Sequence, residues 1–220
     1  MLSSAAIKQH AAELGFDLCG IAPAQPFPEL RFLSDWLARG YAGEMDYLEK
    51  SAGVRADIRN FLPSAKSVIV MGTVYNTQSG SGDPGAGSGE PGAGSRGAAK
   101  VKVARYARGQ DYHKVLEDRL FEMAEWMEEE SPEPFEAAHF VDKHQVQERV
   151  FAHHAGIGWI GKNSCVINPA LGSWLFLCGI ATSLILEPDQ PALEQCGSCT
   201  LCIDACPTGA LVDARELDAT

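Results

Sequence analysis

The chain has 220 residues, 45% hydrophobic and 21% charged, which is the make-up of a globular protein with a sizeable core. It shows no secretion signal and no apolar run of membrane-spanning length, and its cysteines are clustered, so we expect a cytoplasmic protein without membrane contact. The formal net charge of -11 disfavours a nucleic-acid partner, although four basic residues surround Tyr106: Lys100, Lys102, Arg105 and Arg108.

The N-terminal third predicts two helices and two strands. A serine cap precedes apolar residues at helical spacing over residues 3–14, and the same spacing recurs over 28–39. Residues 16–21 form a short apolar run, and residues 67–75 are rich in β-branched side chains. Both of these runs predict strands.

The middle of the chain contains a compositional break. Residues 77–97 are almost all Gly, Ser, Pro and Ala, which predicts a disordered surface loop because they offer little apolar area to bury. Residues 101–106 are interpreted as a return to the same sheet. The second half then predicts helices at 111–130 and 145–154 and strands at 135–141 and 173–186. The alternation predicts an α/β or α+β fold with a mixed sheet flanked by helices.

The strongest motif is a run of four cysteines, Cys196, Cys199, Cys202 and Cys206, followed by Pro207. Its C-x2-C-x2-C-x3-C-P spacing is that of bacterial two-cluster ferredoxins, in which the first three thiolates hold one cluster and the fourth holds the other. Zinc sites favour two separated pairs, so we predict iron–sulfur clusters. No partner run lies within the 220 residues, so the ligand set of each cluster is incomplete in this sequence. The remaining cysteines, Cys19, Cys165 and Cys178, are predicted to be small buried hydrophobes.

Four further features leave alternatives open. Asp142 follows a predicted strand and precedes a helix, so it is either a helix cap, which its spacing favours, or a carboxylate facing a cleft. The glycines of residues 156–161 form either a plain tight turn or a backbone surface that a large ligand can approach closely. His153 and His154 end a helix, where capping or surface placement is favoured over metal ligation. Tyr106 either stacks on a planar ligand or packs against the sheet.

In their order and spacing, several segments together resemble the tRNA epoxyqueuosine reductase family. The segments are the cysteine run and residues 15–22 (GFDLCGIA), 43–48 (GEMDYL), 63–68 (PSAKSV), 104–113 (ARYARGQDYH), 141–142 (VD), 148–149 (ER) and 156–163 (GIGWIGKN). The resemblance implies reduction of epoxyqueuosine to queuosine at the tRNA wobble position. It also implies a reductive-dehalogenase-like corrinoid-binding domain at 1–187, and then half of a two-cluster 4Fe-4S module at 188–220. We therefore expect a C-terminally truncated, monomeric member.

The resemblance also implies roles for single residues. Asp142 would protonate the epoxide oxygen as its bond to carbon breaks. Cobalamin would be bound by Asp142 and by Arg55, Tyr106, Ser164 and Val166. The nucleotide of the tRNA anticodon stem-loop would be bound by Gln147, Glu148 and Arg149. Electrons would come from a low-potential donor through two 4Fe-4S clusters. Two alternatives are a corrinoid iron–sulfur reductase that acts on a small molecule and an inactive cobalamin-binding fragment.

Overall fold

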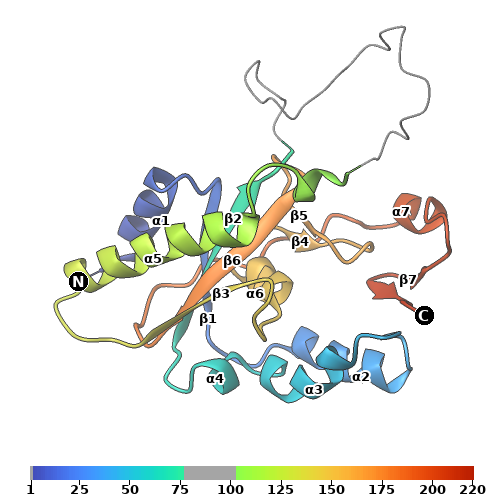
Figure 1. The fold of residues 1–220 in the computed structure, drawn as a ribbon, viewed down its shortest axis with the longest axis horizontal. Helices are drawn as coiled ribbons and strands as arrows, with labels where there is room; N and C mark the ends of the chain where they lie inside the picture. Colours follow the sequence, from blue (N-terminus) through green and yellow to red (C-terminus); the bar gives the residue numbers. More distant parts are fainter. Residues whose placement is uncertain (1, 77–102) are drawn as a thin grey trace, which may run out of the picture.

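The computed structural model describes residues 2–76 and 103–220. At its centre is a four-stranded sheet in which every neighbouring pair is antiparallel, with the order β1-β2-β6-β3. The four strands are β1 (Leu18–Pro23), β2 (Ser67–Val74), β3 (Ala137–Val141) and β6 (Leu175–Thr182). Figure 1 shows the sheet seen obliquely, with helices on both sides. The predicted helix-and-sheet class is confirmed, and so are the approximate positions of its four strands. The prediction of a mixed sheet is wrong, because all neighbouring strands of this sheet run antiparallel.

The sheet is buried on both faces because β2 is apolar at successive positions. Side chains along a strand alternate between the two faces. Val68 and Val70 accordingly belong to one hydrophobic cluster, whereas Ile69 and Met71 belong to the other. All four side chains are fully buried. The fold therefore has three layers, with one core on each side of the sheet.

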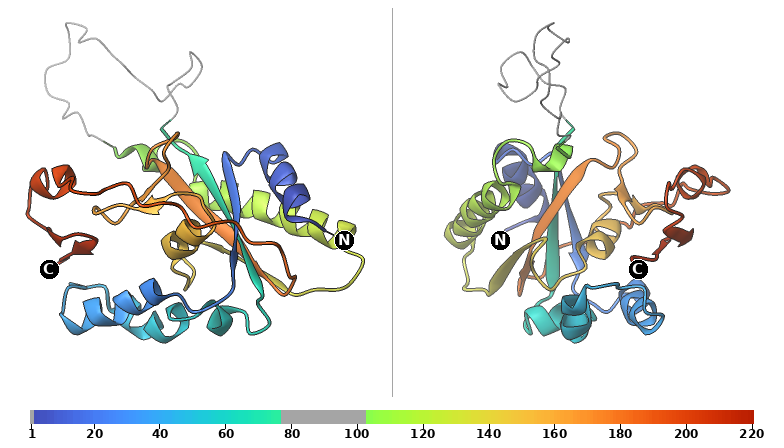
Figure 2. Two further views of the ribbon diagram at one scale, coloured as in Figure 1. Left: turned by 180° about the vertical axis from the view of Figure 1, so that it is seen from behind. Right: turned by 45° about the vertical axis from the view of Figure 1, so that its right-hand side comes forward.

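Two helices cover one face of the sheet, and smaller elements cover the other (Figure 2). On the first face lie α1 (Ser4–Glu13) and α5 (Tyr112–Glu130), which bury their apolar stripes against Ile69 and Met71. On the second face lie η1 (Pro28–Arg31), α4 (Ile58–Phe61) and α6 (Glu148–His154). No helix within residues 2–76 and 103–220 is long and apolar enough to cross a bilayer.

The structure corrects several predicted boundaries. The helix expected over 28–39 is divided into η1 and α2 (Phe32–Ala38), and α3 (Asp46–Arg55) and α4 were not anticipated. The strand expected over 101–106 is wrong for its described part, because residues 103–104 are irregular and residues 105–107 form the 3₁₀ helix η2 (Arg105–Ala107). The loop predicted at 77–97 lies outside the described residues.

The C-terminal segment is bonded to the rest of the fold. After the hairpin of β4 (Trp159–Ile160) and β5 (Val166–Ile167), the chain passes through β6 to α7 (Leu201–Asp204) and to the hairpin of β7 (Leu211–Asp213) and β8 (Glu216–Leu217). Arg215 donates from its backbone to Lys162 O at 2.8 Å and from Nε to Ile160 O at 3.0 Å. These bonds fix the segment against β4.

Candidate functional site

Asp142 lies immediately beyond β3, on a tight turn. Its φ of +26° is in the region that favours glycine, and 65% of its side chain is exposed. The next helix, α6, has Gln147 as its N-cap. The helix-cap interpretation of Asp142, which the spacing favoured, is therefore wrong, and the carboxylate faces outward from the end of a strand.

Tyr112 holds this carboxylate. Its hydroxyl donates a hydrogen bond of 2.5 Å to Asp142 Oδ2, and His113 Nε2 lies 3.5 Å from the same oxygen. The Tyr112 ring is itself fixed, because it stacks on Phe176 of β6 at 4.1 Å between ring centroids with an interplanar angle of 6°. Burial and the hydrogen bond to Asp142 raise the pKa of Tyr112 above its ordinary value. The phenol therefore stays protonated and acts as a donor.

A row of aromatic rings leads from Tyr112 to an exposed tryptophan. The ring centroids of Phe176 and Tyr75 are 4.4 Å apart, and those of Tyr75 and Trp174 are 5.6 Å apart. Trp174 is 43% exposed. Arg105 lies 5.3 Å above the Trp174 ring. The row forms an aromatic surface along one end of β2 and β6, and it ends at Asp142.

A small cavity opens beside the aromatic row. Its volume is about 170 Å³, and it is lined by Thr73, Val74, Gln110, Tyr112, Val115, Leu116, Arg119 and Phe176. Pockets that enclose a drug-sized ligand measure about 300–1,000 Å³. The cavity is therefore too small to enclose a corrin, and a ligand of that size would have to lie across the surface.

Glu148 is a second carboxyl group in this region. It is half-buried in the first turn of α6, and its Oε1 is fully buried with no hydrogen-bond partner among the described residues. Burial, and to a lesser extent the like charge of Asp142, raise the pKa of Glu148 to about 7. A hydrogen bond from its own backbone opposes this shift, as do the charges of Arg55 and Arg149. The two carboxyl groups therefore differ, because Glu148 can keep a proton near neutral pH.

The predicted binding residues around Glu148 mostly make contacts within the chain. Gln147 Nε2 donates to Leu30 O and Arg55 O, and Arg55 donates to Val146 O at 3.0 Å. These bonds join η1, α3 and α6. Gln147 and Arg55 therefore stabilise the packing of these helices, in addition to any contact with a ligand. Arg149 is exposed and donates through Nη1 to Ser164 O at 2.7 Å.

The other predicted cofactor contacts differ in what they present to a ligand. Ser164 has a φ of +65° and lies in the turn between β4 and β5, where its carbonyl accepts the hydrogen bond from Arg149. Val166 is 5% exposed and packs in the core, so a ligand could meet only its backbone. Tyr106 is 53% exposed in η2. The cofactor and nucleotide roles of these residues stay predictions.

The glycines of residues 156–161 are explained by contacts within the chain. A Cβ at Gly158 would lie 2.4 Å from Ile167 O, and one at Gly161 would lie 2.6 Å from Ile167 Cδ1. Gly156 has a φ of +73°. The geometry favours the plain tight turn, which lets β4 and β5 close into a hairpin.

The cysteine run lies on a loop and around the short helix α7. Cys196, Cys202 and Cys206 are half-buried, Cys199 is exposed, and all four are free thiols. The Trp159 indole N–H donates to Cys196 Sγ at 3.3 Å. Hydrogen bonds from backbone amides, of which that of Leu211 has the largest effect, lower the pKa of Cys206. This environment favours the thiolate, which is the form that binds iron.

The three isolated cysteines divide between core and surface. Cys178 is fully buried and Cys19 is half-buried, and burial raises the pKa of both thiols. Cys165 is exposed, so the prediction that it is a buried hydrophobe is wrong. It follows Ser164 in the turn between β4 and β5, where the chain faces solvent.

Sequence reasoning did not single out Tyr112, Tyr75 or Phe176. Each is a single aromatic at the end of a helix or strand, where periodicity predicts core packing. Only the pairing of β2 with β6 and the start of α5 bring the three rings together. A tyrosine directly after the helix-capping Asp111 was the one signal available.

Comparisons with known proteins agree with one another. Residues 55–143 match the family model described as "Epoxyqueuosine reductase QueG, DUF1730". The epoxyqueuosine reductase of Gloeobacter violaceus is 42% identical over 219 residues, which cover 99% of this chain and 63% of that protein. The chain thus spans about three fifths of the length of that relative.

Two solved structures give the same result in three dimensions. An epoxyqueuosine reductase crystallised with an epoxyqueuosine-modified tRNA-Tyr stem loop has a TM-score of 0.78 at 28% identity, covering 96% of this chain and 53% of that one. The Bacillus subtilis epoxyqueuosine reductase, described with its catalytic aspartate loop swung out of the active site, has a TM-score of 0.79 at 29% identity, with coverages of 96% and 53%. The predicted likeness to reductive dehalogenases is one of fold alone, since one such enzyme has a TM-score of 0.50 at 16% identity, covering 96% of this chain and 23% of that one.

Proposed function

We propose that this chain is a member of the epoxyqueuosine reductase family and that it supplies the proton for the reduction of epoxyqueuosine to queuosine in tRNA. The observation that carries the proposal is the exposed Asp142 carboxylate, which lies just beyond β3 and is held by Tyr112 at 2.5 Å. The Bacillus subtilis epoxyqueuosine reductase has a catalytic loop, named by its aspartate, that is swung out of the active site in its structure. Asp142, on a strained and exposed turn, is suited to such a loop.

The reaction defines what Asp142 must do. An epoxide that becomes an alkene takes up two electrons and two protons, both C–O bonds break, and the oxygen leaves as water. The oxygen is a poor leaving group unless it is protonated as its first C–O bond breaks. Asp142 supplies that proton and is reprotonated from solvent, which its 65% exposed side chain permits. Tyr112 keeps the carboxyl group in place through the hydrogen bond to Oδ2.

The surface beside Asp142 suits a large planar cofactor. Bound cobalamin would supply the electrons as a strong reductant. The aromatic row from Trp174 to Tyr112 provides a flat apolar wall, and Arg105 and the exposed Tyr106 stand at its outer end. Arg55, Ser164 and Val166 are proposed to contact the same cofactor, Val166 through its backbone.

Glu148 and Arg149 are proposed to recognise the modified nucleotide. A protonated Glu148 can donate to a base edge, and Arg149 offers several donors to a phosphate or to a base. The Gln147 amide, which is bonded to Leu30 O and Arg55 O, positions the start of α6 beneath them. This arrangement supports binding of the tRNA anticodon stem-loop, although the chain as a whole is acidic.

The C-terminal segment is proposed to be the part of the chain that receives electrons from the donor. Cys196, Cys199 and Cys202 would hold one 4Fe-4S cluster, and Cys206 would contribute to a second. The donor set fits this chemistry, because the hydrogen bonds at Cys196 Sγ and around Cys206 are of the kind that tune cluster potentials. A low-potential electron donor, a monomeric state and a domain boundary near residue 187 remain part of the proposal.

A single-turnover assay tests the role of Asp142. The chain, loaded with cobalamin and reduced chemically under anaerobic conditions, is mixed with an anticodon stem-loop that contains epoxyqueuosine. Loss of one oxygen from the nucleoside is then followed by mass spectrometry. Asp142→Asn should retain cobalamin, as judged by its absorption spectrum, but should form no queuosine. Asp118→Asn, on the exposed side of α5, is the matched control and should react like the wild type.

The same assay separates the proposal from its alternatives. Full turnover by Asp142→Asn would remove Asp142 from the mechanism. If the wild-type chain binds the stem-loop and cobalamin but reduces nothing, it is a binding fragment. If it reduces small halogenated compounds but leaves the stem-loop unchanged, it is a reductase of small molecules.

A further inference from the structure

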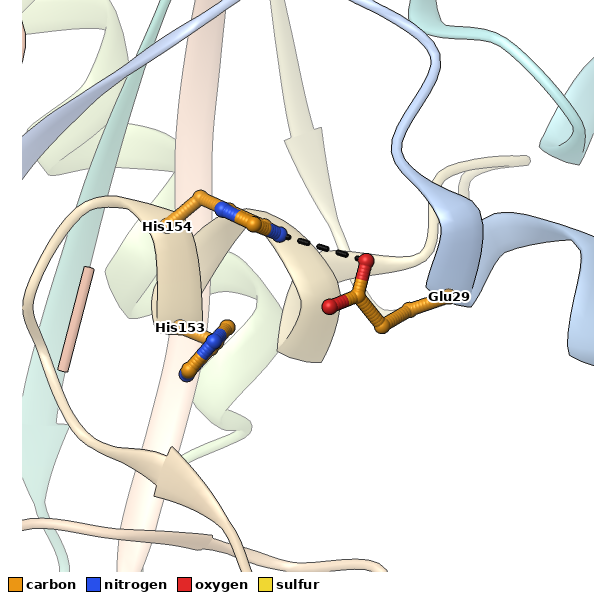
Figure 3. Close-up of side chains that lie close together, drawn as sticks. All are labelled: Glu29, His153 and His154. Atoms are coloured by element: carbon orange, nitrogen blue, oxygen red, sulfur yellow. Dashed lines mark hydrogen bonds and ion pairs between the residues drawn. The ribbon is translucent and has the colours of Figure 1, made fainter. Parts of the chain in front are cut away.

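Three potential metal ligands meet away from Asp142, between η1 and the end of α6. Glu29 comes from η1, and His153 and His154 come from the last turn of α6. One ligand atom from each residue lies within 4.8 Å of the other two. Figure 3 shows the Glu29 carboxylate approaching His154, with the His153 ring beside them. All three residues are half-buried.

The spacing of the first pair suits two ligands of one ion. His154 Nε2 and Glu29 Oε2 are 3.3 Å apart, which is long for a direct N–H···O hydrogen bond. Zinc binds imidazole nitrogen and carboxylate oxygen at about 2.0–2.2 Å in a tetrahedral arrangement, so two of its ligands stand about 3.4 Å apart. The observed separation therefore needs almost no adjustment.

The His154 ring is already held in place. It stacks on Phe27 with its centroid 3.6 Å from that of Phe27 and an interplanar angle of 5°. Phe27 is 5% exposed and belongs to the core below. A ring fixed in this way loses little further freedom when a metal binds, which favours binding.

His153 provides the second, independent observation. Its Nδ1 is buried and has no hydrogen-bond partner among the described residues. An unpartnered buried polar atom costs about 1–3 kcal/mol, so such atoms are uncommon in native proteins. A simple ion pair between Glu29 and His154 accounts for those two side chains but not for the orientation of His153.

We propose that Glu29, His153 and His154 form a zinc site whose fourth position is taken by water. Two imidazoles and one carboxylate, without thiolate, make a donor set that zinc accepts, whereas magnesium and calcium prefer oxygen ligands throughout. The proposal replaces the prediction that the two histidines only cap the helix or face solvent. It does not depend on the proposed reductase activity.

The position of the site indicates what the metal would stabilise. The carbonyl of His153 accepts from the backbone of Ala192 at 3.0 Å, in the segment that leads to the cysteine run. A Cβ at Gly156 would lie 2.8 Å from Gln190 O, so this segment packs closely on the end of α6. A zinc ion would join η1 to α6 at the point where the C-terminal segment is attached.

Zinc titration of the intact chain tests the proposal. Accessible thiols are first alkylated with iodoacetamide under native conditions, because the cysteine run would otherwise bind zinc. Zn²⁺ is then added in competition with a chromogenic chelator. The variants are His154→Gln and Glu29→Gln. The control is His10→Gln, because His10 and Glu13 form a similar pair, with 3.2 Å between Nδ1 and Oε2, that has no third ligand among residues 2–76 and 103–220.

The alkylated wild type and His10→Gln should each bind one equivalent of Zn²⁺. The affinity of His154→Gln and of Glu29→Gln should fall at least about tenfold, while their circular dichroism and urea midpoints without metal stay near those of the wild type. Cobalt(II) in the same site should show visible ligand-field bands without a sulfur charge-transfer band. Absence of zinc binding by the alkylated wild type would overturn the proposal, and so would equal affinity in all four proteins.

Discussion

The buried carboxyl group of Glu148 should make the stability of the chain depend on pH. Its pKa is raised to about 7 in the folded protein by burial and by the charge of Asp142, whereas the ordinary value is 4.5. Below pH 4.5 the group is protonated in both states and has no effect. Between pH 4.5 and 7 the folded state keeps a proton that the unfolded state releases, so the free energy of unfolding falls as the pH rises.

The magnitude follows from the two pKa values. One pH unit between them corresponds to about 1.36 kcal/mol, so the full loss is on the order of 3 kcal/mol once the pH exceeds 7. Glu148→Gln retains the size and shape of the side chain but cannot ionise. The variant should therefore gain stability relative to the wild type as the pH rises, and the difference should reach about 3 kcal/mol by pH 8.

Urea unfolding of both proteins at pH 5, 6, 7 and 8 measures this difference. Subtracting the wild-type curve from the variant curve cancels the other titrating groups, which the two proteins share. Glu125→Gln, at an exposed position of α5, is the matched control and should give a flat difference. A flat difference for Glu148→Gln as well would show that the carboxyl group is not desolvated by folding.

Three other substitutions test neighbouring contacts. Tyr112→Phe removes the O–H donor to Asp142 but keeps the ring stack. Single-turnover reduction should therefore slow on the order of tenfold, while the free energy of unfolding changes by less than about 1 kcal/mol. An unchanged rate would contradict the role of Tyr112 in holding Asp142. Gly20→Ala places a Cβ 2.0 Å from the carbonyl oxygen of Ala155. The clash should lower the urea midpoint and reduce the free energy of unfolding by about 1–3 kcal/mol or more. An unchanged midpoint would show that α6 is free to shift. Cys199→Ser should lower the iron bound after anaerobic reconstitution, measured by iron assay and absorption, and retention of the wild-type iron content would exclude Cys199 as a ligand.

Periodicity predicted the elements that bury a continuous apolar stripe. The stripe of α5 and the β-branched run of β2 both appear where the sequence places them. By contrast, α3 buries only Ser51, so it has no apolar spacing from which it could be predicted. It is held in part by tertiary bonds such as the one from Gln147 Nε2 to Arg55 O.

Site residues were predictable only where the chemistry is local in sequence. The cysteine run is recognisable from spacing alone. The environment of Asp142 is not, because its partner Tyr112 lies in another element and the turn that exposes it depends on where β3 ends. Glu29 and His154 are 125 positions apart, and only the packing of η1 on α6 brings them together.

The two proposed sites share α6 but should act independently. Its first residues, Glu148 and Arg149, belong to the proposed nucleotide-binding site, and its last two, His153 and His154, belong to the proposed zinc site. Coupling between two sites requires a structural element with two conformations, and each ligand must bind one of these conformations more tightly than the other. The end of α6 is instead fixed on β1, where Gly20 leaves no room for even one Cβ beneath Ala155. Zinc should therefore raise the stability of the chain and leave the affinity for the stem-loop unchanged.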